Sequence, residues 1–169
     1  MSNCSINIVT LSGDNTRIFE VLNAIKCDDQ PIGSVDFNKI TPAPAGSDYK
    51  WRCENWGTLG NAIYDDEWEF TELVEISETS VRIEFVTDGN GACPVIAKLA
   101  KMNADLEIEH MWSEDSLVYE GSGKDVYVNG ECIDHYFPRG EESVIFACKV
   151  WDVEESIEDC LECYREENE

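Results

Sequence analysis

Several short segments of this chain alternate apolar with polar residues, and any fold must give each of them one buried and one exposed side. The clearest are residues 5–11, 80–87 and 106–112, and residues 67–76 follow the same pattern more loosely. A period of two residues is that of a β-strand, whose successive side chains point to opposite faces of a sheet. The pattern therefore predicts a sheet of several strands with one face turned toward a core.

Between these segments lie two stretches with the period of an amphipathic helix. The first covers residues 14–26, and the second begins at Pro94, which suits the first turn of a helix because its missing N–H is not needed there. Their apolar stripes, which we expect to pack on the sheet, include Ile18, Leu22, Ile96 and Leu99. This order of elements is typical of an α+β domain with helices on one face of a mostly antiparallel sheet.

The segments between these elements carry weaker signals. Residues 35–40 favour a short extended piece, and residues 45–64 favour irregular structure because glycines and tryptophans interrupt any period. Residues 116–120 and 125–128 resemble the two arms of a hairpin around residues 121–123.

The C-terminal part has a different period. After Gly140 the apolar residues recur three or four positions apart, which predicts a long helix that begins between Glu141 and Asp152. A strand over residues 143–149 is the competing prediction, because residues 144–148 are continuously apolar.

Three blocks of residues carry a resemblance to a known family. They read DFNKITPAP at residues 36–44, ENWGTLGNA at residues 54–62 and PVIAKL at residues 94–99. In this order they resemble the YubB-like ferredoxin-like proteins of plasmids and phages, although Leu59-Gly60 replaces the usual Lys-Trp pair. The resemblance implies a ferredoxin-like core over residues 4–125 and a mobile-element origin, and it implies no known activity.

Together with the periodicity, the resemblance predicts one domain over residues 1–169. Residues 126–169 would complete the hairpin and add an acidic C-terminal helix to the core. No linker or internal repeat divides the chain.

The charge balance restricts the partners of such a domain. The chain has 36 acidic and 12 basic residues, for a net charge of −24. Such a surface repels DNA, RNA and anionic membranes and favours a basic protein partner, divalent cations or simple solubility. No segment reaches the about 18 apolar residues of a membrane span, and the N-terminal residues lack the basic and apolar regions of a signal peptide. We therefore expect the cytoplasm of a bacterial host cell, where the eight cysteines stay reduced.

The acidic residues are concentrated toward the C-terminus, where residues 152–169 hold nine acids and one base. A ridge of carboxylates four residues apart, about 6 Å per rung, is predicted there, with two further acids beside it. The residues of this ridge are Glu154, Glu155, Glu158, Asp159, Glu162 and Glu166. Regular negative charge of this kind resembles a nucleic-acid backbone, and a solvated helix face is the simpler alternative.

These features suggest an interaction protein of a mobile element. It would have no enzymatic activity, and it would bind and inhibit a nucleic-acid-binding host enzyme, such as a CRISPR-type defence nuclease, through its anionic surface. The alternative is an accessory domain that binds a peptide or small ligand in a groove formed by Trp51, Asn55, Trp56 and Tyr64. The same tryptophans could instead attach an irregular loop to the sheet.

The sequence contains no catalytic motif, and we expect no cofactor or metal. Cys160 and Cys163 have the spacing of a metal-binding pair, and Cys148, His110 and His135 are candidates for further ligands. Without a second such pair, the two cysteines are better interpreted as small apolar residues of the helix. The acids at 65–67 lack the spacing of a calcium loop and favour a solvated turn.

Overall fold

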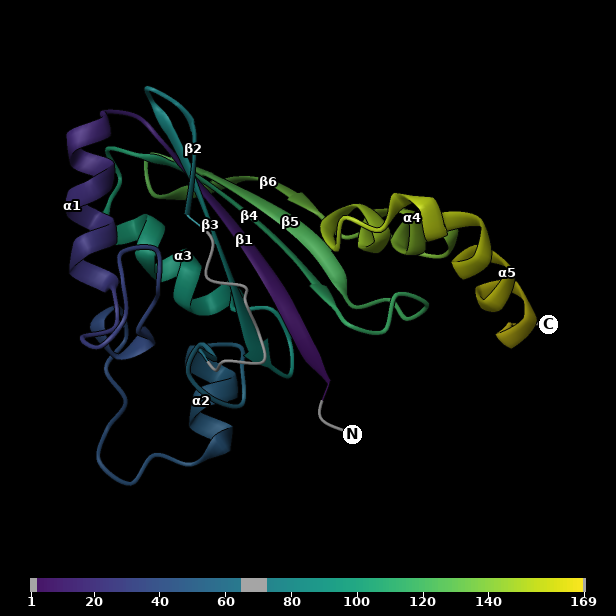
Figure 1. The fold of residues 1–169 in the computed structure, drawn as a ribbon. Helices are drawn as coiled ribbons and strands as arrows, with labels where there is room; N and C mark the ends of the chain where they lie inside the picture. Colours follow the sequence, from purple (N-terminus) through teal and green to yellow (C-terminus); the bar gives the residue numbers. More distant parts are fainter. Residues whose placement is uncertain (1–2, 65–72, 169) are drawn as a thin grey trace.

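The structure, a computed structural model, describes residues 3–64 and 73–168, and one antiparallel sheet organises them (Figure 1). The strands of this sheet follow the order β2-β3-β1-β4-β5-β6. Their bounds are β1 Cys4–Ser12, β2 Leu73–Ser77, β3 Ser80–Asp88, β4 Glu107–Glu114, β5 Ser122–Val128 and β6 Glu131–Tyr136. The predicted α+β class with an antiparallel sheet is confirmed.

Helices α1 (Asn15–Ile25) and α3 (Cys93–Met102) pack on the same face of this sheet (Figure 1). The order β1-α1-β2-β3-α3-β4, with β1 in the centre, is that of a ferredoxin-like split βαβ unit. The predicted helix contacts are confirmed. The buried core between the two layers includes Val9, Leu11, Ile18, Leu22, Ile96 and Leu99.

Helix α4 (Glu141–Val150) packs on part of the opposite face of the sheet. Successive residues of β1 point to opposite faces, so Ile6 and Ile8 lie away from Val9 and cluster with Val150 of α4. Helix α5 (Ile157–Glu167) then packs on α4 through Leu161, which contacts the cluster around Val144 and Cys148. Figure 1 shows α4 and α5 extending together from one end of the sheet.

The C-terminal helical region is interrupted, so the expectation of one long helix is wrong in part and the competing strand over 143–149 is wrong. Helix α4 ends at Val150 with Trp151 as its C-cap, and Asp152 adopts a positive φ of 55°. The amides of Asp152 and Val153 then bond to the carbonyls of Lys149 and Cys148, which is how a left-handed residue commonly terminates a helix. A short 3-10 helix, η2 (Glu154–Ser156), precedes α5.

The hairpin expected around residues 121–123 lies elsewhere. Residues 116–120 form no strand, and β5 pairs with β4 on one side and β6 on the other. The β5–β6 turn is Asn129-Gly130, with φ values of 53° and 77°. Two residues with positive φ match the tight turn that the twist of a hairpin favours, and Asn-Gly is its commonest sequence signal.

The segment between α1 and β2 is more ordered than the sequence suggested. Residues 37–39 form a 3-10 helix, η1 (Phe37–Lys39), capped by Asp36, rather than an extended piece. Helix α2 (Tyr49–Asn55) lies within the stretch expected to be irregular, and the Asp48 carboxylate caps it by accepting the N–H of Trp51 at 3.0 Å. Residues 67–72 of the strand expected over 67–76 lie outside the described residues, as do the acids at 65–67.

Candidate functional site

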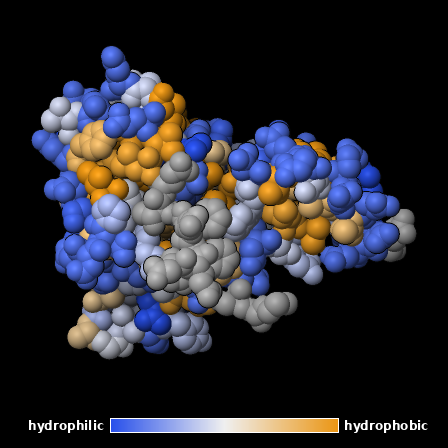
Figure 2. All heavy atoms as spheres, in the orientation of Figure 1, coloured by the Kyte–Doolittle hydropathy of each residue, from blue (hydrophilic) through white to orange (hydrophobic). Residues whose placement is uncertain are grey.

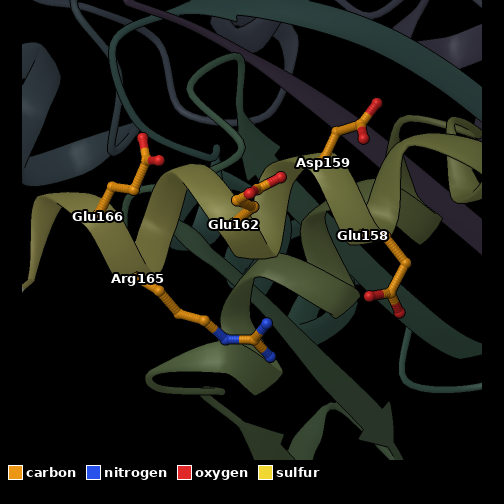
Figure 3. Close-up of a pocket in the computed structure, with 5 residues that line it drawn as sticks. All are labelled: Glu158, Asp159, Glu162, Arg165 and Glu166. Atoms are coloured by element: carbon orange, nitrogen blue, oxygen red, sulfur yellow. The ribbon is translucent and has the colours of Figure 1, made fainter.

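The acidic residues of α5 are exposed side by side on one helix. Figure 3 shows Asp159, Glu162 and Glu166 projecting to the same side of α5, whereas Glu158 points in another direction. With Arg165 these residues line a surface pocket of about 530 Å³. In Figure 2 hydrophilic side chains dominate the surface over α5, at the far right of the view. The C-terminal segment therefore presents several carboxylates to solvent at close range.

The predicted ridge is shorter than the sequence suggested. Glu154 and Glu155 are exposed but lie in η2, before α5 begins. Because residues 154–156 form a 3-10 helix, the spacing from Glu154 to Glu158 is not that of an α-helix, so the expected α-helical ridge from Glu154 to Glu166 is wrong in part. The rungs within α5 remain.

Arg165 lies among these acids but forms its ion pair with Glu141. Its Nε and Nη2 donate to the two carboxylate oxygens of Glu141 at 2.7 and 3.1 Å. This two-point ion pair between α5 and the start of α4 raises the pKa of Arg165 and lowers that of Glu141. The only base of residues 152–169 is thus engaged by an acid outside that segment.

The two cysteines of the Cys160/Cys163 pair differ in exposure. Cys160 is partly buried and packs with Cys148 and Leu161, whereas Cys163 is exposed. Burial and contact with Cys160 raise the pKa of the Cys148 thiol to about 11. Packing of α5 on α4 therefore directs one sulfur of the motif inward and leaves the other in solvent.

A second group of candidate residues lies beneath α3. His110 of β4 stands directly opposite Asp125 of β5 in the strand register, and Cys93 is the first residue of α3, which packs on this face of the sheet. One ligand atom from each of these three residues lies within 4.8 Å of the others. His110 and Asp125 are buried, and Cys93 is partly buried. Thiol, imidazole and carboxylate groups thus converge in the interior.

Neighbouring hydrogen bonds determine the tautomer of His110. The Oδ1 of Asn7 accepts the backbone N–H of Ala92 at 2.8 Å, and the Nδ2 of Asn7 donates to Thr87 at 3.0 Å, which orients the amide. His110 Nε2 lies 3.0 Å from the same Oδ1. Because Oδ1 is only an acceptor, Nε2 must carry the proton, and Nδ1 keeps a lone pair. Nδ1 is buried without a hydrogen-bond partner in the described part of the chain.

Burial also controls the protonation of this cluster. It lowers the pKa of His110 to about 3, so the imidazole is neutral near pH 7. Burial, followed by the charge of Asp125, raises the pKa of the Cys93 thiol to about 12. The Asp125 carboxylate is hydrogen-bonded to His135 Nδ1 and to the Tyr127 hydroxyl, the latter at 3.4 Å.

We expect acid to destabilise the fold through His110. The unfolded chain binds a proton at His110 below about pH 6.5, whereas the folded chain does not until about pH 3. The contribution of neutral His110 to the free energy of unfolding is therefore fully present above about pH 6.5. It decreases as the pH falls, by about 2 kcal/mol at about pH 5. Urea unfolding of the parent and of His110→Gln, each at about pH 6.5 and at about pH 5, separates the contribution of His110 from that of the titrating acidic residues. Equal pH dependence of the two proteins would contradict the assignment.

The residues of the expected ligand groove take part in internal contacts. Trp56 is buried and donates its Nε1–H to the Thr41 carbonyl at 2.9 Å. Asn55 Nδ2 donates to the Trp51 carbonyl at 2.9 Å, and the Tyr64 hydroxyl accepts the Val35 N–H. Trp51 and Tyr64 are partly buried against the main core. These contacts attach the segment to the sheet, and a groove at this place stays a prediction.

Sequence reasoning considered His110 but not Cys93 or Asp125. No motif spacing links the three, because they come from three elements of the chain. A signal did exist in the strand patterns: Asn7, His110 and Asp125 are polar residues at positions whose neighbours in the same alternation, such as Leu11 and Ile108, are core residues. Polar side chains on a buried face need partners, which makes them candidates for a site.

Comparison with known proteins identifies a fold family. The family model described as the ferredoxin-like domain in Api92-like protein matches residues 63–161, more than half of the chain. Protein api92 from Yersinia pseudotuberculosis, known from a crystal structure, aligns with 66% of this chain at 17% identity and a TM-score of 0.46. The alignment covers 43% of that protein, so the chain spans less than half of its length. No curated protein matches the sequence.

Within the described residues, the helices are too short or too polar to cross a membrane.

Proposed function

This chain belongs to the family of the ferredoxin-like domain in Api92-like proteins, and we propose, from its surface rather than from its fold, that it binds a basic partner protein through α5. It acts without enzymatic activity. The partner is a nucleic-acid-binding enzyme of a bacterial host, such as a CRISPR-type defence nuclease, and binding inhibits it. The chain itself originates from a phage or plasmid and works in the host cytoplasm.

The observation that carries this proposal is the uncompensated charge of α5. Asp159, Glu162 and Glu166 project together (Figure 3), and the nearby Arg165 is paired with Glu141. Like charges three or four residues apart destabilise a helix by roughly 0.2–0.5 kcal/mol per pair. The helix tolerates this cost because Leu161 anchors it on α4. A group of exposed acidic residues that destabilises the helix carrying it is consistent with selection for binding.

The same arrangement suits a nucleic-acid-binding partner. Carboxylates about 6 Å apart along a helix approximate the spacing of charge along a nucleic-acid strand. A surface rich in Arg and Lys, built to neutralise phosphates, would accept them. A net charge of −24 would also accelerate encounter with such a surface, because long-range attraction steers the two proteins together. DNA, RNA and anionic membranes are repelled for the same reason.

We expect partner binding to weaken steeply with salt, because exposed charge pairs are screened within about 8–10 Å at physiological ionic strength. The immobilised full chain would be incubated with purified nucleic-acid-guided nucleases and with a bacterial lysate, at low and at high salt. High salt, or added single-stranded DNA or RNA, should release the bound nuclease. In a cleavage assay at low salt, the chain should inhibit the nuclease. Binding that persists in high salt, or inhibition that excess nucleic acid cannot relieve, would contradict charge mimicry.

A further inference from the structure

The Nδ1 atom of His110 is a buried acceptor that lacks a donor. His110 is fully buried, its Nε2–H is donated to Asn7, and the described residues provide no hydrogen-bond partner for Nδ1. An unsatisfied buried polar atom costs about 1–3 kcal/mol. Native proteins rarely retain such an atom without a water, an ion or a functional reason. The lone pair therefore requires a partner.

The groups around His110 indicate what that partner is. One ligand atom from each of Cys93, His110 and Asp125 lies within 4.8 Å of the other two, and Nδ1 is the ring nitrogen of His110 that keeps a free lone pair. Sulfur, imidazole nitrogen and carboxylate oxygen are the ligand types of Zn²⁺, and at Zn–ligand lengths of 2.0–2.3 Å two tetrahedral ligands stand about 3.5 Å apart. Side-chain rotations that shorten the longest of these distances by about 1.3 Å would bring the three atoms onto one ion. A hard ion such as Mg²⁺ would instead prefer oxygen ligands throughout.

The charges and the surrounding hydrogen bonds match the same ion. A Cys93 thiolate and the Asp125 carboxylate carry two negative charges, which offset a divalent cation in the protein interior; the thiol proton is released to solvent on binding. Metal-binding histidines typically donate their other ring N–H to an oxygen acceptor, which orients the ring. Asn7 Oδ1 provides this acceptor and is itself held by the Ala92 amide.

Access to this cluster exists through Cys93. Cys93 also lines a pocket of about 280 Å³, together with Trp112, Glu114 and Phe137. Three protein ligands leave one tetrahedral position for water or another molecule. We propose that Cys93 Sγ, His110 Nδ1 and an Asp125 carboxylate oxygen bind one Zn²⁺ ion. The site differs from the Cys160/Cys163 pair that the sequence suggested, and it is independent of the acidic helix.

The test uses the full chain, stripped with a chelator and then titrated with Zn²⁺ or Co²⁺. Equilibrium dialysis should find one bound Zn²⁺ per chain, and Co²⁺ should give a thiolate-to-metal charge-transfer band in the near ultraviolet. Cys93→Ser should lower the affinity by more than about 100-fold. The matched control, Cys160→Ser/Cys163→Ser, removes two thiols and should leave binding and spectrum unchanged.

A second measurement avoids dependence on a variant that fails to fold. The chain has two histidines, so ¹⁵N spectra of the parent with a His135→Gln reference identify the His110 ring. Zn²⁺ should move the Nδ1 resonance upfield from the position of an unprotonated nitrogen. An unchanged Nδ1 resonance, an absence of stoichiometric binding, or a cobalt band lost only in the Cys160/Cys163 variant would overturn the proposal.

Discussion

Replacing Trp56 by alanine should lower the free energy of unfolding by about 3–5 kcal/mol, as expected for a buried aromatic residue whose removal leaves a cavity. Trp56 is 3% exposed and meets Phe37 and Trp51 edge to face, with ring centroids 5.6 Å apart in both pairs. The substitution also leaves the Thr41 carbonyl without the indole donor that it accepts. Equilibrium urea unfolding, followed by circular dichroism, measures the loss.

Two further substitutions test the interpretation of Trp56. Trp56→Phe keeps most of the ring volume but removes the N–H donor, so it should cost less, about 1–3 kcal/mol. Tyr49→Ala removes an aromatic ring of α2 that is 66% exposed and should change stability by no more than about 0.5 kcal/mol. If Trp56→Ala were as mild as Tyr49→Ala, Trp56 would not be a core residue, and the ligand-groove hypothesis would gain support.

Reversing the charge of α5 should abolish partner binding while the fold persists. The triple variant Asp159→Lys/Glu162→Lys/Glu166→Lys alters three exposed side chains that project together (Figure 3). At about 1 kcal/mol or more per position, the affinity for a basic partner should fall by about 100-fold or more. The fold should remain because Leu161, which anchors α5 on α4, is unchanged. Quantitative binding and nuclease-inhibition assays measure the effect.

A matched control separates the location of the charge from its amount. Asp29→Lys/Glu75→Lys/Glu78→Lys changes the net charge equally at exposed sites outside the C-terminal helices. This control should retain most of the affinity. If both triple variants lost binding alike, only overall charge would matter; if neither lost it, α5 would be no more than a solvated face.

The elements of the ferredoxin-like core could be predicted because their signals are local. Alternation over residues 5–11 and 80–87, and the stripe that begins at Ile18, report burial within one element, and β1, β3 and α1 follow them closely. Helix α2 and strand β6, which the sequence did not predict, also have local signals. Asp48 is a capping signal within a stretch that glycines and tryptophans make look irregular, and Asn129-Gly130 is a hairpin-turn signal.

The prediction for the C-terminal segment, one continuous helix, was wrong for a different reason. Its apolar residues recur with one helical period through Val150 and Val153 to Leu161, so periodicity alone predicts a continuous helix. The left-handed conformation of Asp152 separates α4, which covers the sheet, from α5, which packs on α4. The 3-10 helix η2 that follows the break places Glu154 and Glu155 outside the α-helical spacing of α5.

The sequence by itself determined the class of fold and the acidic character of this protein, because residue periodicity and net charge do not depend on which elements become neighbours. Only the tertiary structure placed Cys93, His110 and Asp125 together. These residues belong to α3, β4 and β5, and their proximity depends on strand register and on the docking of a helix onto the sheet. Such contacts result from the packing of the whole chain, which no local pattern encodes.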